Sequence, residues 1–194
     1  MSMKKIFILT IVMFCAIYSF AQEHLAFKGV PIDGTLSSYV AKMKAKGFTS
    51  VGTSDGIAAL KGDFAAHKSC TILVGTMQNK DLVSRIAVIF PSQDQWRFLY
   101  GDYSELKELL TIKYGEPTEC IEQFQGYTFS DLTDNDKITR VQLDECTYRT
   151  VFHTNNGDIQ LSIEHQSVVS CFVRLLYVDK INNDTVRQDA LDDL

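Results

Sequence analysis

The sequence predicts an α+β fold made of two tandem units, each a helix followed by antiparallel strands, with about eight strands in all and the two main helices packed on one sheet face. One observation is an amphipathic stretch over 92–117, whose apolar residues recur three and four positions apart, as on the buried side of a helix. Another is that segments with alternating apolar residues precede and follow this stretch. The order of helix and then strands occurs twice, which predicts the two units.

The first residues have the pattern of an export signal. Lys4 and Lys5 precede an apolar run over 6–18, and small residues before Gln22 fit a cleavage site. The apolar run is shorter than the roughly 20 residues that a membrane span needs. A cleaved signal peptide over 1–21 is therefore favoured over a retained anchor helix, and the chain is expected to be exported and periplasmic or extracellular.

The mature chain is long enough for a single domain with a real core. We expect one α+β domain over 22–181, with units at 33–91 and 92–181, and an acidic tail over 182–194 that is either a frayed helix or disordered. Loss of the two signal lysines leaves 17 basic and 24 acidic residues, a net charge of −7. This acidic balance argues against nucleic acid and anionic membrane surfaces as partners. No second apolar run predicts a membrane span in the mature chain.

The first unit opens with a helix after a short extended lead. Asp33 or Thr35 can cap this helix, and Gly47 ends it. Turn signals then separate four segments that are typical of strands. The predicted strands are 48–53, 57–66, 70–77 and 82–90.

The second unit opens with the helix of the amphipathic stretch. Ser92 and Gln95 have the spacing of a capping box, while Gly115 and Pro117 form a stop signal. The predicted strands of this unit are 120–127, 147–154, 158–165 and 168–179. Trp96 lies in register with the apolar side of the helix, so core packing is favoured over a role as a partner-binding anchor.

An insertion over 126–145 separates the first two strands of the second unit, and its polar part, 130–137, is expected to be a mobile loop. Asp131, Asp134 and Asp136 are close together there. The residue order of an EF-hand is absent, so a solvated loop is favoured over a calcium site.

The mature chain has four cysteines, Cys70, Cys120, Cys146 and Cys171, and in an exported protein they can form disulfides in three connectivities. Cys120 and Cys146 each begin a predicted strand among polar residues, which favours a bridge between them. Cys70 and Cys171 alternate with apolar residues, so buried free thiols are the alternative for this pair. The spacings are not those of a zinc site or a thioredoxin-type motif, and no cofactor or metal is expected.

Residues 52–56 match G-x-S-x-G, the nucleophile pattern of serine hydrolases, with Ser54 at its centre. That motif needs a helix after it, whereas a strand is predicted here, so a hairpin turn is favoured. The histidines have no metal-binding spacing, and a surface position is favoured for each. They are His24, His67, His153 and His165. A small hydrolase using Ser54 or a histidine remains an alternative function.

The helix and the closing strand of the first unit contain TLSSYVAKM and LVSRIAVIF, and the second unit contains SELKELLTIKYGEP, GDIQLSIEH and FVRLLYVD. In the architecture that these segments form, the chain resembles the β-lactamase inhibitory protein family and related small envelope-protein modules. The chain is also similar to uncharacterised exported bacterial proteins in which a YGEP helix end precedes strands. The resemblance implies binding to another protein across an exposed sheet face, and it carries over no functional residue.

Apolar residues also occur where solvent is expected. On the last three strands of the second unit, the outward positions are Arg149, Val151, His153, Gln160, Ser162, Glu164, Phe172, Arg174 and Leu176. Apolar residues bordered by polar ones mark interaction surfaces, unless the insertion or the tail covers them. We therefore predict a non-enzymatic binding module that engages a protein partner through Arg149, His153, Phe172, Arg174 and Leu176. A carrier of a small apolar ligand between sheet and helices is a further alternative.

Overall fold

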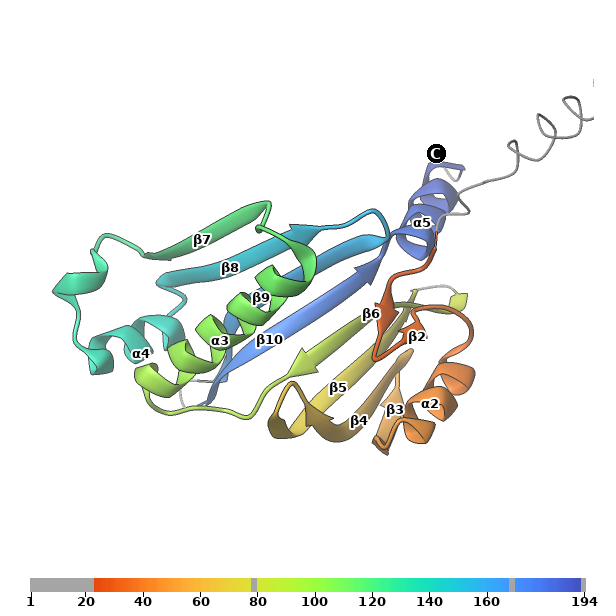
Figure 1. Cartoon of the computed structure of the whole chain (residues 1–194), viewed down its shortest axis with the longest axis horizontal. Helices are drawn as coiled ribbons and strands as arrows, with labels where there is room; N and C mark the ends of the chain where they lie inside the picture. Colours follow the sequence, from red (N-terminus) through yellow and green to blue (C-terminus); the bar gives the residue numbers. More distant parts are fainter. Residues whose placement is uncertain (1–22, 78–79, 168–169, 193–194) are drawn as a thin grey trace, which may run out of the picture.

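The central feature of the fold is an eight-stranded antiparallel sheet in the order β3-β4-β5-β6-β10-β9-β8-β7 (Figure 1). The structure is a computed structural model that describes residues 23–77, 80–167 and 170–192. The predicted signal peptide, 1–21, lies outside the described residues. The strands are β3 (Thr49–Ser54), β4 (Ile57–Phe64), β5 (His67–Met77), β6 (Lys80–Ile89), β7 (Glu119–Phe124), β8 (Cys146–His153), β9 (Gly157–Ser167) and β10 (Ser170–Asp179).

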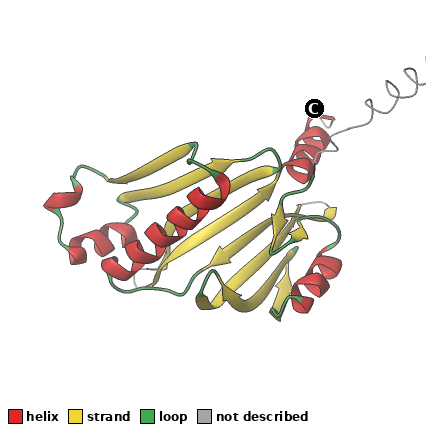
Figure 2. Ribbon diagram, viewed as in Figure 1, coloured by secondary structure: helices red, strands yellow, loops and turns green. Residues whose placement is uncertain are grey.

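Helices α2 (Leu36–Ala45), α3 (Trp96–Tyr114) and α4 (Asp134–Gln142) pack against one side of this sheet, while α5 (Lys180–Asp192) continues from the end of β10 (Figure 2). The chain also forms a short 3-10 helix η1 (Phe129–Asp131) and a small hairpin of β1 (Ala26–Phe27) and β2 (Val30–Pro31). Figure 1 shows α3 lying across β8, β9 and β10, while α2 contacts β3 to β6. The predicted α+β class, with two main helices on one sheet face, is confirmed.

Strand alternation decides which side of the sheet is buried. Along β10, Cys171, Val173, Leu175 and Tyr177 are at most 4% exposed, and the residues between them are half-buried. The same parity holds on the neighbouring strands, and the buried side joins Tyr39 of α2 and the side chains of α3 in one core. Trp96 is 2% exposed, which confirms its predicted place in this core.

Local signals explain the helix ends. The hydroxyl of Thr35 accepts a hydrogen bond from a backbone N–H of the first turn of α2, as an N-cap does. The predicted box of Ser92 and Gln95 is wrong: Gln95 is the N-cap of α3 without a side-chain bond, and the Ser92 hydroxyl pairs with that of Ser170 at 2.9 Å. Gly115, at φ 86°, ends α3 as predicted.

The insertion is ordered, so the predicted mobile loop over 130–137 is wrong. Thr133 and Asp136 form a capping box at the start of α4, and Asp131 completes a second one at η1. Ile138 and Val141 then bury the inner side of α4 in the core. Of the carboxylates that suggested a calcium loop, Asp131 and Asp136 are helix caps, and Asp134 lies 3.7 Å from Lys137 Nζ.

The closing strands of the two halves pair at the centre of the sheet. Arg174 of β10 lies opposite Ile89 of β6 in this antiparallel pair. Each half has the expected order of one helix and four strands, with η1 and α4 inserted in the second. The origin of the halves as repeats stays a prediction. The turn expected between the predicted strands 57–66 and 70–77 lies earlier, at Ala65 and Ala66, whose φ angles are 48° and 66°.

The C-terminal segment is helical, and its first turn is tied into the fold. Asp179 is fully buried and accepts hydrogen bonds from the N–H groups of Leu25, at 2.6 Å, and Asn182, at 2.9 Å. His24 lies 3.0 Å from the same carboxylate. The structure therefore shows a helix here, one of the two predicted alternatives. The Asp179 carboxylate connects the segment around Leu25 to the first turn of α5.

Candidate functional site

The side of the sheet that faces away from the helices is the largest candidate surface, and we call its outward residues on the seven strands β4 to β10 the open sheet face. Its middle row is apolar: Ala59, Leu73, Ala87 and Leu176 lie opposite one another across four strands. These side chains are half-buried because neighbours in the row cover one another. The face thus presents a continuous apolar strip across the seam between β6 and β10.

A second row runs parallel to this strip and contains two of the predicted residues. Arg149 and Arg174 flank Ser162 on adjacent strands. Arg149 Nη2 lies 2.6 Å from Glu119 Oε1, and Arg174 Nη2 lies 2.8 Å from Glu164 Oε1. The long arginine stems border the apolar strip while their charged ends stay paired.

The third row lies on the other side of the strip and ends at the predicted His153. His153 Nδ1 is 2.7 Å from Asp158 Oδ1 on the next strand. Arg85 lies in the same row, and its side chain passes over Gly75, where a Cβ would sit 3.0 Å from the arginine. The open sheet face is therefore bordered by charged groups on both sides of its apolar strip.

The other predicted residues also lie on this face. Phe172 and Leu176 stand on either side of Arg174 along β10, and both are half-buried. The insertion and the C-terminal segment do not cover them, because Ile138 of α4 belongs to the core on the helical side and Asn182 of α5 bonds the carbonyl of Ile32 there. The sequence left two possibilities, an exposed interaction surface and a face covered by the insertion or the tail, and the described residues fit the exposed surface.

The charge on this face differs from that of the whole chain, whose net charge is −5. The outward cations are Lys61, Arg85, Arg149 and Arg174, and the outward carboxylates are Glu119, Asp158 and Glu164. By alternation Asp63 of β4 also points outward, so the face is close to neutral and most of the negative charge lies elsewhere.

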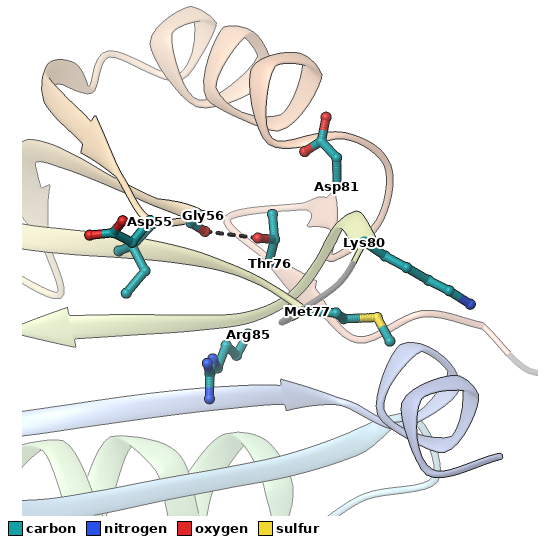
Figure 3. Close-up of a pocket in the computed structure, with 8 residues that line it drawn as sticks. Asp55, Gly56, Thr76, Met77, Lys80, Asp81 and Arg85 are labelled. Carbon is teal, nitrogen blue, oxygen red and sulfur yellow. Dashed lines mark hydrogen bonds between the residues drawn. The ribbon is translucent and has the colours of Figure 1, made fainter. Parts of the chain in front are cut away.

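A hollow of about 770 Å³ lies at the end of the sheet, beside the β3–β4 turn (Figure 3). Its charged side chains point in different directions in Figure 3. Asp81 accepts a hydrogen bond from the N–H of Leu36 at 2.8 Å, and Asp55 accepts one from Ser54 at 2.9 Å. Because these carboxylates are already engaged and do not converge, the hollow is not a good candidate for a ligand site.

The G-x-S-x-G match is a hairpin turn, as predicted. Ser54 and Ile57 are paired at the end of β3 and β4, and Asp55 and Gly56 between them have φ angles of 49° and 73°. Two positive φ values are typical of the tight turn that joins two antiparallel strands. The sharp strand-to-helix turn of a serine hydrolase is not formed here.

A cluster that the sequence did not reveal lies where β8 and β9 stop pairing. Cys146, His165 and Asp144 line a hollow of about 260 Å³, and Asp144 Oδ1 is 2.9 Å from His165 Nε2. Within the described residues, no hydrogen bond joins Cys146 to His165, whose Nδ1 is buried without a partner. Burial raises the pKa of the Cys146 thiol to about 12. The residue types of a cysteine–histidine–aspartate triad are present, but burial favours the neutral thiol over the nucleophilic thiolate.

The predicted bridge between Cys120 and Cys146 is absent, since all four described cysteines are free. The register gives the reason: Cys120 lies opposite Thr150, and Cys146 lies opposite Phe124. Four positions along paired strands separate the two cysteines by about 13 Å, whereas a disulfide needs Cα atoms within about 7 Å. The polar neighbours of Cys120 and Cys146 indicated that both lie near the surface, but they did not indicate how β7 and β8 are aligned with each other.

The described part of the chain has no group of His, Cys, Asp and Glu residues that could hold a metal ion. The same residues include no helix long and apolar enough to span a membrane. The chain matches no family model, no curated protein and no solved structure in the comparisons.

Proposed function

We propose that this chain is an exported, non-enzymatic binding module whose open sheet face engages a protein partner. The observation that carries the proposal is the apolar strip of Ala59, Leu73, Ala87 and Leu176, which lies in register across the uncovered side of the sheet. Contiguous apolar surface bordered by polar groups is characteristic of interaction sites. The resemblance to the inhibitory-protein architecture points the same way, because such proteins bind across a sheet face.

The size of the face suits a protein better than a small ligand. Seven strands at about 4.8 Å spacing span about 29 Å, and about 20 Å along the strands gives a flat area near 600 Å². A standard protein interface buries about 600–1,000 Å² on each partner. Small ligands instead need concave pockets. A matching partner surface would have an apolar strip that packs on the strip described here, and acidic or polar borders that lie beside Arg149 and Arg174.

Site-specific photo-cross-linking in the producing cells tests this proposal. A photoreactive amino acid placed at Ala87 lies in the middle of the strip, and one at Ile112, which is 76% exposed on α3, is the matched control. The expected result is a discrete protein adduct from position 87 and none from position 112. Combined replacement of Phe172 and Arg174 by alanine should abolish that adduct. An adduct that persists in this double variant, or no adduct at position 87, contradicts the proposal.

A further inference from the structure

The outermost strand of the sheet, β3, has no neighbour on its outer side within the described residues. All six of its residues are exposed, Val51 by 61%. None of them is charged, and none is proline. The strand therefore leaves a row of backbone N–H and C=O groups without protein partners along one edge.

The opposite edge strand, β7, is protected in the usual way. Glu119 and Glu122 lie on it, and Pro117 precedes it. Glu122 pairs with Lys107 of α3 at 2.6 Å, which fixes charge at that edge. Charges and proline are the devices that prevent an edge strand from pairing with another chain. In β3 only a bulge between Ser50 and Gly52 departs from a regular edge.

The surroundings of the first residues of β3 are basic in an otherwise acidic chain, while the exposed Asp55 follows its last residue. No acidic residue occurs between positions 34 and 54, where α2 and its C-cap carry the exposed Lys42, Lys44 and Lys46. Lys46 and Lys61 line a hollow of about 390 Å³ together with Thr49, the first residue of β3. Asp63 also lines it, but Lys68 Nζ holds that carboxylate at 2.6 Å.

The four lysines near β3 have no ion-pair partner in the part of the chain that the structure describes. They are Lys42, Lys44, Lys46 and Lys61. A second copy of this chain would bring two such groups of lysines together, which like-charge repulsion disfavours. An acidic segment would instead be attracted to them, so the charge selects a partner of opposite sign.

We propose that β3 is a docking strand for an extended, acidic segment of another protein. The segment adds to the sheet beside β3 and places a carboxylate in the hollow between Lys46 and Lys61. Backbone hydrogen bonds supply affinity in this mode of recognition, and side-chain contacts supply specificity. The exposed Val51 offers an apolar contact to the added strand. This surface lies at the edge of the sheet and shares only Lys61 and Asp63 with the open sheet face.

NMR titration of the isotope-labelled mature protein tests the inference. The probe is a synthetic peptide of alternating glutamate and valine, as long as β3. Its controls are the same peptide with lysine in place of glutamate, and the acidic peptide with N-methylated valines, which cannot pair as a strand. The expected result is a shift of the β3 backbone amide signals with the acidic peptide and loss of that shift with the methylated one. The acidic peptide should bind about two- to fivefold more tightly for each lysine that it meets.

A charge-reversed variant completes the test. Lys46→Glu with Lys61→Glu should prefer the lysine peptide, while its thermal unfolding stays close to that of the unchanged protein because both side chains are exposed. Three outcomes overturn the inference: no shift of β3 amides at millimolar peptide, equal binding of the methylated peptide, or equal binding of acidic and basic peptides. The apolar strip that the cross-linking experiment tests is unchanged in this charge-reversed variant, so a negative cross-linking result leaves the present test unaffected.

Discussion

Leu175 and Leu176 are neighbours on β10 that point to opposite sides of the sheet, and replacing each with aspartate measures how open the sheet face is. Leu175 is 1% exposed within the core, whereas Leu176 is half-buried in the apolar strip. Leu175→Asp loses about 1.5–3 kcal/mol of apolar burial and places a carboxylate where desolvation costs several kcal/mol more. The sum approaches the whole stability of a typical domain, about 5–15 kcal/mol, so this variant should be largely unfolded.

Leu176→Asp should behave differently because its carboxylate remains in water. Partial loss of apolar contact predicts a fall of about 1 kcal/mol or less in the free energy of unfolding. Urea unfolding followed by the fluorescence of Trp96, the single tryptophan, reports on both variants, since this side chain is 2% exposed in the core. Equal and severe destabilisation by the two substitutions would refute the reasoning, because it would mean that the outer side of the sheet is covered in solution.

Three further predictions concern the buried contacts and caps. Tyr103 and Thr150 are fully buried, and their hydroxyl oxygens lie 2.6 Å apart. Tyr103→Phe and Thr150→Val should each lower the free energy of unfolding by about 1–3 kcal/mol in urea, and the double variant should lose clearly less than the sum. Additive losses would contradict the hydrogen bond. In the unfolded state Cys146 loses its proton near the ordinary pKa of about 8.5, whereas burial raises the pKa of the folded state to about 12. The free energy of unfolding should therefore fall as pH rises between these two values, and it should fall less steeply in Cys146→Ser. Identical slopes in the two proteins would argue against a buried thiol. Thr133→Ala removes the N-cap of α4 and should lower the free energy of unfolding by about 1 kcal/mol. Amide hydrogen exchange should become faster in α4 alone. Unchanged exchange there would show that the cap does not stabilise this helix.

Patterns local in the sequence predicted most of the elements of this fold. All eight strands and the two main helices follow from alternation and three-to-four spacing, and Thr35 and Gly115 mark helix ends as expected. Helix α4 was missed because its cap uses Asp136 in place of the glutamate or glutamine of the usual pattern, and because only Ile138 and Val141 form its apolar side. A short polar helix of this kind depends on the surface that it covers.

Contacts that depend on register could not be predicted in the same way. Parity placed Arg149 and Arg174 on one side of the sheet, but only the pairing of β8, β9 and β10 puts them on either side of Ser162. Cys146 and His165 likewise line the same hollow only because β8 and β9 stop pairing there, next to the end of α4. A period of two residues fixes the face of a strand, whereas its position along the neighbouring strand comes from turns and core packing far away in the chain.

The seam between β6 and β10 explains why the binding surface requires both halves of the chain. Ala59, Leu73 and Ala87 come from the first half and Leu176 from the second, and the strip is continuous only because Ala87 and Leu176 are paired across the seam. Neither half alone would present more than part of the strip, and each would expose an unpaired edge strand at the seam. The eight-stranded sheet thus keeps the edges of β6 and β10 paired at its centre and, by the same pairing, forms a flat surface wide enough for a protein.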